Sequence, residues 1–192
     1  MDLVLASASP RRKEILGKVT ENFTVVVSTF EEDTVKYKGD IQWYVKELSK
    51  GKAETVSANL KNEALVIGCD TVVSLQGNIL GKPKDEQDAF FMLKSLSGKW
   101  HEVYSGITII NTKTNKFLSE CVCTKVKFSH ISDDDIKKYI ETKEPMDKAG
   151  AYGIQGFAGI FVEKIEGCYY NVVGLPLNKL NFMMRDMGVN LL

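Results

Sequence analysis

One acid lies in the middle of an otherwise apolar segment, which makes it the first candidate for chemistry. The run Leu65–Leu75, LVIGCDTVVSL, is typical of a strand, and Asp70 lies near its centre. A carboxylate there is costly to bury unless a cation pairs with it or a metal ion binds it. Gly68 removes a side chain where another backbone or a ligand could approach closely. From this segment alone, a functional acid, a turn residue and an acid paired with a core lysine or arginine all stay open.

A second segment has the features of a phosphate site. The short apolar strand Leu3–Ala6 leads to Ser9 and Pro10, a good N-cap and a good first helical residue. Arg11 and Arg12 follow directly. Unpaired backbone N–H groups, the positive end of the helix dipole and guanidinium groups all attract phosphate. The alternative is a capped helix with two solvated arginines, because the pattern is neither a Walker loop nor a GxGxxG.

Further acids follow another predicted strand. Phe23–Val27 leads to a loop that carries Glu31, Glu32 and Asp33. Alone, this run is typical of a solvated acidic loop. Beside Asp70, it becomes a candidate source of a second carboxylate for a metal ion.

Two lysines lie where they could meet phosphate. A long helix is predicted from Asp40 to about Asn59, and the period of its apolar stripe extends to Lys52. Either Lys52 snorkels from the core, or its ammonium points toward a charged ligand. Lys82 directly precedes Pro83, which ends the strand returning from a hairpin turn at Gln76-Gly77-Asn78.

A glycine-rich segment is the least ordinary part of the sequence. Its glycines allow positive φ and close approach of a ligand. Gln155, inside this segment, carries both donors and acceptors and can therefore read the edge of a nucleobase. A flexible loop is the alternative, but such loops are usually more polar than AGAYGIQGFAG. The glycines recur every three residues, at Gly150, Gly153, Gly156 and Gly159.

The other elements place these residues in a mixed α/β protein. Several strands alternate with amphipathic helices, and nothing indicates a repeat or a low-complexity segment. A last helix is expected near Pro176, after the segment Asn171–Pro176. The remaining predicted elements are helices over Glu86–Leu96 and Ile136–Thr142, and strands over Glu102–Asn111, Phe117–Phe128 and Ile160–Ile165.

Composition excludes several classes of protein. The 192 residues suit one large domain or two small lobes that share a core. Because 25 basic and 25 acidic residues cancel, we expect no stable nucleic-acid partner and no membrane partner. No apolar run reaches the roughly 18 residues of a membrane span. The first residues place their charges after the apolar run, the wrong order for a signal peptide, so we expect a cytoplasmic protein with free thiols.

Taken together, these segments resemble the Maf family of nucleoside triphosphate pyrophosphatases nearly end to end. Several spaced motifs in one order are far more specific than any single one. The motifs are LASASPRR (Leu5–Arg12), Glu31-Glu32, Gly51-Lys52-Ala53, GCDTVV (Gly68–Val73), GKP (Gly81–Pro83), LSG (Leu96–Gly98), KAGAYGIQG (Lys148–Gly156) and NVVGLP (Asn171–Pro176).

The resemblance implies one Maf-like domain over residues 1–192, with an elongated twisted sheet, helices around it and a cleft between two lobes. It also implies a homodimer and hydrolysis of a nucleoside triphosphate to monophosphate and pyrophosphate. Arg11-Arg12, Asp70-Thr71 and Ile154-Gln155-Gly156 resemble the branch that takes dTTP and UTP.

The same resemblance assigns roles to the candidate residues. Asp70 is the acid/base residue, while Arg12, Thr71 and Gln155 govern the choice of substrate. On physical grounds, Asp70 with Glu31 or Glu32 would hold Mg²⁺ or Mn²⁺. The residues expected to contact the triphosphate are Ser9, Arg11, Arg12, Lys52 and Lys82. Two other functions stay open: a nucleotide- or nucleic-acid-binding regulator of cell division without turnover, and a phosphotransferase.

Overall fold

The computed structural model describes residues 1–191. Within that range, seven strands form one sheet in the order β2-β1-β3-β5-β6-β7, with β4 paired to β3. The strands are β1 (Asp2–Ala6), β2 (Thr24–Val25), β3 (Ala64–Leu75), β4 (Asn78–Leu80), β5 (Trp100–Asn111), β6 (Phe117–Phe128) and β7 (Val162–Glu166). The sheet is mixed, because β1 is parallel to β2 and β3 whereas β4 and β7 are antiparallel to their neighbours. The predicted mixed α/β class, a twisted sheet flanked by helices, is confirmed.

The α-helices are α1 (Pro10–Gly17), α2 (Ile41–Ser57), α3 (Glu86–Leu96), α4 (Asp133–Glu141), α5 (Tyr169–Val173) and α6 (Leu177–Asp186). Short 3₁₀ turns are η1 (Glu32–Thr34), η2 (Glu144–Asp147), η3 (Ala149–Ala151) and η4 (Phe157–Phe161). Among the described residues, none of these helices combines the length and the apolar composition that crossing a lipid bilayer requires.

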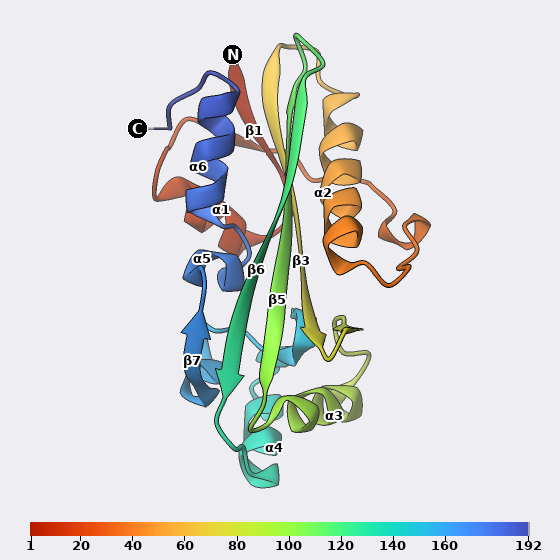
Figure 1. Cartoon of the computed structure of the whole chain (residues 1–192), viewed down its shortest axis with the longest axis vertical. Helices are drawn as coiled ribbons and strands as arrows, with labels where there is room; N and C mark the ends of the chain where they lie inside the picture. Colours follow the sequence, from red (N-terminus) through yellow and green to blue (C-terminus); the bar gives the residue numbers. More distant parts are fainter. Residues whose placement is uncertain (192) are drawn as a thin grey trace. The chain divides into compact units, whose positions relative to one another are not determined.

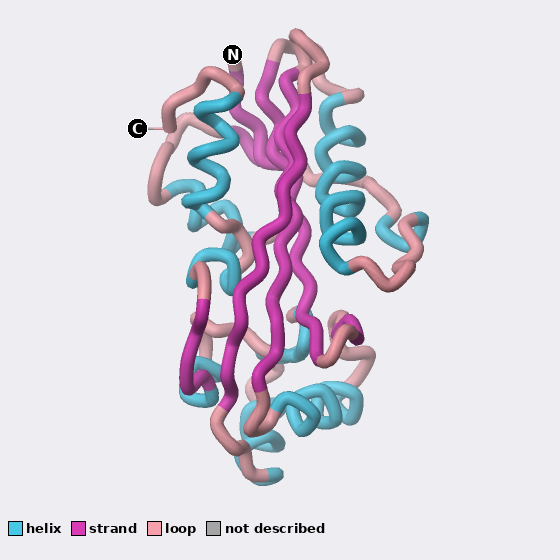
Figure 2. The backbone as a smooth tube through the Cα atoms, in the orientation of Figure 1, coloured by secondary structure: helices cyan, strands magenta, loops and turns pink. Residues whose placement is uncertain are grey.

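The chain forms two compact units. The first comprises Met1–Asp70, Ser105–Val122 and the residues from Gly174 onward. The second comprises Thr71–Tyr104 and Cys123–Val173. Strands β3, β5 and β6 each contain residues of both units. Figure 2 draws the strands in magenta along the backbone tube.

In the first unit, helices lie on both sides of the strands. Figure 1 shows α1 and α6 on one side and α2 on the other. Helix α2 lies directly against the sheet, because a Cβ atom on Gly68 of β3 would come 2.1 Å from the backbone oxygen of Ser49. A Cβ on Gly106 of β5 would come 2.0 Å from the backbone oxygen of Val45. Gly68 therefore makes room for a helix backbone, one of the two possibilities that the sequence left open.

In the second unit, α3 and α4 pack together, and aliphatic and aromatic side chains fill the space between the helices and the strands. Phe128 lies at the centre of an aromatic cluster, with the ring centroids of His101 and Tyr152 both 4.8 Å away. This cluster contacts the glycine-rich segment through Tyr152, so the segment belongs to the core of this unit.

Several predicted boundaries are confirmed and others are wrong. Ser9 and Asp40 each accept a backbone N–H at the start of their helix, as predicted, and Asp85 and Ser132 do the same for α3 and α4. The predicted strand Phe23–Val27 shrinks to Thr24–Val25, which pairs with β1 alone. The predicted strand Ile160–Ile165 begins only at Val162, because Phe157–Phe161 form a 3₁₀ turn. Helix α5 was not predicted, and with five residues it is too short to show a helical period.

Candidate active site

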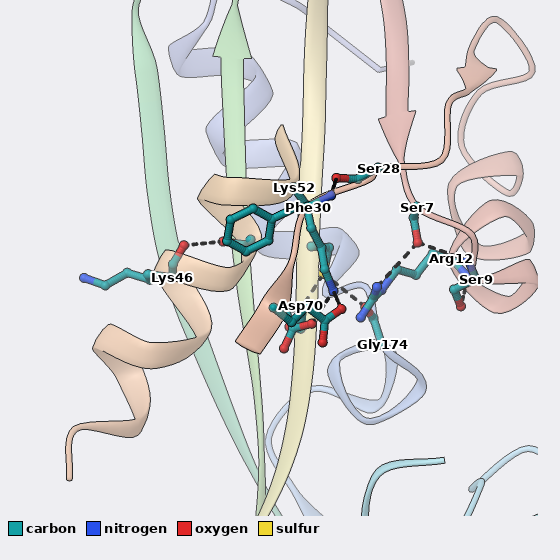
Figure 3. A network of polar contacts seen from close by, with 12 residues as sticks. Ser7, Ser9, Arg12, Ser28, Phe30, Lys46, Lys52, Asp70 and Gly174 are labelled. Atoms are coloured by element: carbon teal, nitrogen blue, oxygen red, sulfur yellow. Dashed lines mark hydrogen bonds and ion pairs between the residues drawn. The ribbon is translucent and has the colours of Figure 1, made fainter. Parts of the chain in front are cut away.

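Asp70 is buried in β3 and forms an ion pair with a lysine from α2. The side chain of Asp70 is 10% exposed and its Oδ1 lies 2.5 Å from Lys52 Nζ (Figure 3). The same ammonium lies 2.7 Å from Oε1 of Glu32, the first residue of η1, which follows β2 in the chain. One lysine therefore pairs with two carboxylates that come from separate parts of the chain.

Close packing places Lys52 in this position. The stripe on α2 that carries Lys52 faces the sheet, so that only 14% of the lysine side chain is exposed. On the preceding residue, Gly51, a Cβ atom would come 2.3 Å from the ring of Phe30. Gly51 therefore leaves room for the Phe30 ring, which lies beside α2 (Figure 3). The predicted inward position of Lys52 is confirmed.

Charge in this cluster is balanced between opposing effects. Burial alone would lower the pKa of Lys52, but the charge of Asp70 and the hydrogen bonds to Asp70 and Glu32 outweigh it, so the pKa is raised. Arg12 is close enough to oppose that rise. Burial, and after it the charges of Asp70 and Glu32, raises the pKa of Tyr44. Lys52 therefore remains an ammonium at neutral pH, and Tyr44 remains a neutral phenol.

Hydrogen bonds hold both the backbone and the guanidinium of Arg12. Its backbone N–H donates to Oγ of Ser9, the N-cap of α1, at 3.4 Å. Its guanidinium donates from Nε to the backbone oxygen of Gly174 at 2.9 Å and from Nη1 to Oγ of Ser7 at 3.4 Å (Figure 3). Arg12 is therefore an oriented guanidinium and not a mobile surface side chain. The alternative of a solvated arginine is wrong for Arg12.

The backbone oxygen of Gly174 has a second donor, the thiol of Cys69. Cys69 is fully buried next to Asp70, and its Sγ lies 3.2 Å from that oxygen. Burial raises the pKa of Cys69, so the thiol keeps its proton and can donate. Gly174 itself has a φ of 125°, which favours glycine at this position.

The other predicted residues of the first unit lie around this cluster. Ser9 and Arg11 are partly buried at the start of α1. Glu31 is exposed, and its backbone oxygen accepts the hydroxyl of Thr34 at 2.6 Å. Of the predicted carboxylates, Glu32 and Asp70 are the two that contact Lys52.

Three predicted residues belong to the second unit. Thr71 directly follows Asp70 in β3 and is partly buried. Lys82 is exposed in the loop after β4. Gln155 is exposed in a turn that the hydrogen bond from Gly156 N–H to the backbone oxygen of Gly153 closes at 3.1 Å.

The donor set suits a hard divalent cation only in part. Oxygens of Asp70 and Glu32 lie 2.5 Å and 2.7 Å from the same lysine nitrogen, and carboxylates are among the ligands that Mg²⁺ prefers. Over residues 1–191, however, no group of three or more histidine, cysteine, aspartate or glutamate side chains gathers as a metal site. A cation there would need ligands from the substrate or from water, as Mg²⁺ usually does.

Three positioning groups were missed from the sequence: the Ser7 hydroxyl, the Gly174 carbonyl and the Cys69 thiol. Ser7 and Gly174 lie inside the motifs LASASPRR and NVVGLP, so the motifs marked the segments without indicating which atoms act. The carbonyl of Gly174 carries no side-chain signal. Its contact with Arg12 spans 162 positions of the chain, so only the folded structure shows it.

Comparison with known proteins identifies the family of this chain. The family model described as Maf-like protein matches residues 2–187. A protein of Clostridium novyi named dTTP/UTP pyrophosphatase is 60% identical over 191 residues, which cover 100% of both chains. A protein of the same name from Clostridium tetani is 54% identical over 192 residues, again 100% of both chains. By the match along nearly its whole length, the chain belongs to the Maf family.

Proposed function

We propose that this protein hydrolyses nucleoside triphosphates, preferably dTTP and UTP, to the monophosphate and pyrophosphate. The observation that carries the proposal is the cluster in which Asp70 and Glu32 share the ammonium of Lys52, with Arg12 fixed nearby. A triphosphate brings about four negative charges that basic groups must neutralise, whereas an acid beside them is needed to activate water. The names of the full-length relatives support the same activity.

In this reaction, a water molecule attacks the α-phosphorus and the bond to the bridging oxygen of the β-phosphate breaks. Asp70 accepts the proton of the attacking water, and its ion pair with Lys52 fixes the carboxylate in place. Arg12, Lys52 and Lys82 stabilise the negative charge that builds up on the leaving pyrophosphate. The monophosphate and pyrophosphate then leave as separate products.

A divalent cation, Mg²⁺ or Mn²⁺, is the proposed cofactor. Glu32 and Asp70 would hold it, and Glu31 lies next to Glu32 in the chain. Such a cation neutralises phosphate charge and lowers the pKa of a bound water.

Base recognition is assigned to Gln155 and Thr71, which carry the amide and hydroxyl groups needed to hydrogen-bond a pyrimidine edge. A site that pairs with a specific polar edge strongly rejects analogues that lack it. We propose that residues 1–192 act as one functional domain. We further propose a homodimer, which sedimentation tests, and a location in the cytoplasm, which cell fractionation tests. We propose no nucleic-acid partner.

A panel of dTTP, UTP, CTP, ATP and GTP, assayed with Mg²⁺, with Mn²⁺ and with neither, tests the proposal. We expect pyrophosphate and not orthophosphate as the product, with dTTP and UTP well above the purines. Water labelled with heavy oxygen should place its label in the monophosphate. Tight binding of nucleotide without turnover would instead indicate a regulator. Transfer of a phosphoryl group to an acceptor other than water, with no heavy oxygen in the product, would indicate a phosphotransferase. Equal purine rates would overturn the base preference alone.

A further inference from the structure

We propose that Tyr139 and Glu144 clamp the turn that carries Gln155 and so determine how strongly the enzyme discriminates between bases. This inference rests on the proposed function, because it assigns to two further residues the positioning of the base-reading side chain. All groups involved lie in the second unit.

The clamp holds both ends of the turn Gly153–Gly156. At the first end, the backbone N–H of Gly153 donates to the hydroxyl of Tyr139 at 3.3 Å. Just past the second end, the backbone N–H of Phe157 donates to Oε2 of Glu144 at 3.0 Å. The two holding groups are themselves joined, because the Tyr139 hydroxyl donates to Oε1 of Glu144 at 2.9 Å.

The clamp accounts for the glycine at position 156, and the neighbouring Lys148 side chain accounts for Gly153. A Cβ atom on Gly156 would come 2.2 Å from Oε2 of Glu144, and one on Gly153 would come 2.7 Å from Cε of Lys148. Gly153 and Gly156 do not have a positive φ. Of the four glycines that recur every three residues, only Gly150 has one, at 66°. At Gly153 and Gly156, side chains of the protein itself therefore occupy the space in which the sequence led us to expect a ligand.

Two more contacts fix the start of the same segment. Lys148 Nζ donates to the backbone oxygen of Glu144 at 2.8 Å, which joins the clamp residue to the first residue of the motif. The backbone N–H of Gly150 donates to the oxygen of Gly81 at 3.0 Å, and Gly81 directly precedes Lys82. The segment that presents Gln155 is thus tied to the loop that presents Lys82.

Held at both ends, the turn has little freedom, although Gln155 itself is exposed. A side chain that must pair with one base edge depends on where its backbone lies, and small misplacements reduce rates strongly. Tyr139 and Glu144 are therefore positioning residues: they act on the substrate only through Gln155.

The test is Tyr139→Phe, which removes the hydroxyl and keeps the ring packed against Phe161, at a centroid distance of 5.6 Å. The measurement is the ratio of kcat/KM for dTTP to kcat/KM for ATP. We expect this ratio to fall about tenfold, the effect of roughly one lost hydrogen bond with a charged partner. Because a smaller folded fraction lowers both values equally, the ratio does not respond to a merely structural effect.

Tyr152→Phe is the matched control. It removes a buried hydroxyl from the same segment, but one that is hydrogen-bonded to Nε2 of His101 at 2.8 Å and not to the turn. Its ratio should stay within about twofold of the wild type. Glu144→Gln, at a partly buried position, provides a second variant if Tyr139→Phe fails to fold.

A double-mutant cycle with Gln155→Ala decides whether the clamp acts through Gln155. In that background, Tyr139→Phe should change the ratio no further. The clamp is refuted if Tyr139→Phe and Glu144→Gln keep the wild-type ratio while Gln155→Ala lowers it, or if the effects multiply. A wild-type enzyme that releases pyrophosphate without base preference would refute both the clamp and the base reading. A wild type without any hydrolysis would refute the proposed function itself.

Discussion

Replacing Asp70 with asparagine should remove most of the activity and leave the fold nearly intact. The amide keeps the size of the carboxylate but cannot take the proton of the attacking water. General-base catalysis contributes typically 10²–10⁴-fold, so kcat for dTTP should fall by about that factor.

The expected loss of stability follows from the ion pairs of Lys52. Removing one partner of a buried pair usually costs about 3–5 kcal/mol, because the other charge stays buried and uncompensated. Here Lys52 keeps Glu32 at 2.7 Å, so we expect Asp70→Asn to cost only about 1–2 kcal/mol, a Tm shift of about 2–8 °C. Lys52→Met removes the cation that both carboxylates share, and should approach the full cost of about 3–5 kcal/mol.

The assay combines steady-state release of pyrophosphate with thermal denaturation of the same preparations. Lys52→Met serves as the comparison, because it should lose both activity and stability, whereas Asp70→Asn loses mainly activity. If Asp70→Asn keeps turnover within tenfold of the wild type at an unchanged Tm, Asp70 is not the base. If Asp70→Asn is destabilised as much as Lys52→Met, the assumption that Glu32 compensates Lys52 is wrong.

Three further predictions concern pH, packing and the cation. Burial lowers the pKa of His101 to about 4, so between pH 6.5 and 4 only the unfolded chain binds this proton. As the pH falls across that window, the free energy of unfolding measured by urea titration should therefore fall by about 3 kcal/mol. His101→Gln should weaken this dependence of stability on pH. Gly68→Ala should cost about 3 kcal/mol in the same measurement, since its Cβ would meet the Ser49 carbonyl at 2.1 Å, while Gly17→Ala, with nothing within 4 Å, should change stability by less than about 0.5 kcal/mol. Removing divalent cations with EDTA should lower pyrophosphate release by about 10²-fold or more, reversed by Mg²⁺ or Mn²⁺; unchanged rates in EDTA would contradict the proposed cofactor.

The features of the fold that depend on residues close in sequence could be predicted from the sequence. The helix starts at Ser9, Asp40 and Asp85 each satisfy a backbone N–H three positions along the chain. The hairpin after β3 turns at Gln76 and Gly77, both with positive φ. Such signals need no distant partner, and they were predicted correctly. By contrast, β2 exists only through its pairing with β1, and its length could not be predicted from its own residues.

The sequence by itself determined which residue types were available for chemistry and that Lys52 lies on the inward stripe of its helix. Only the tertiary structure decided that its ammonium meets Asp70, 18 positions away, and Glu32 as well. Likewise, the glycine period was visible in the sequence, but the carboxylate of Glu144 against Gly156 was not. The physical reason is common to both cases: a local pattern encodes backbone conformation and the direction of a side chain, whereas the choice of partner depends on how distant segments pack.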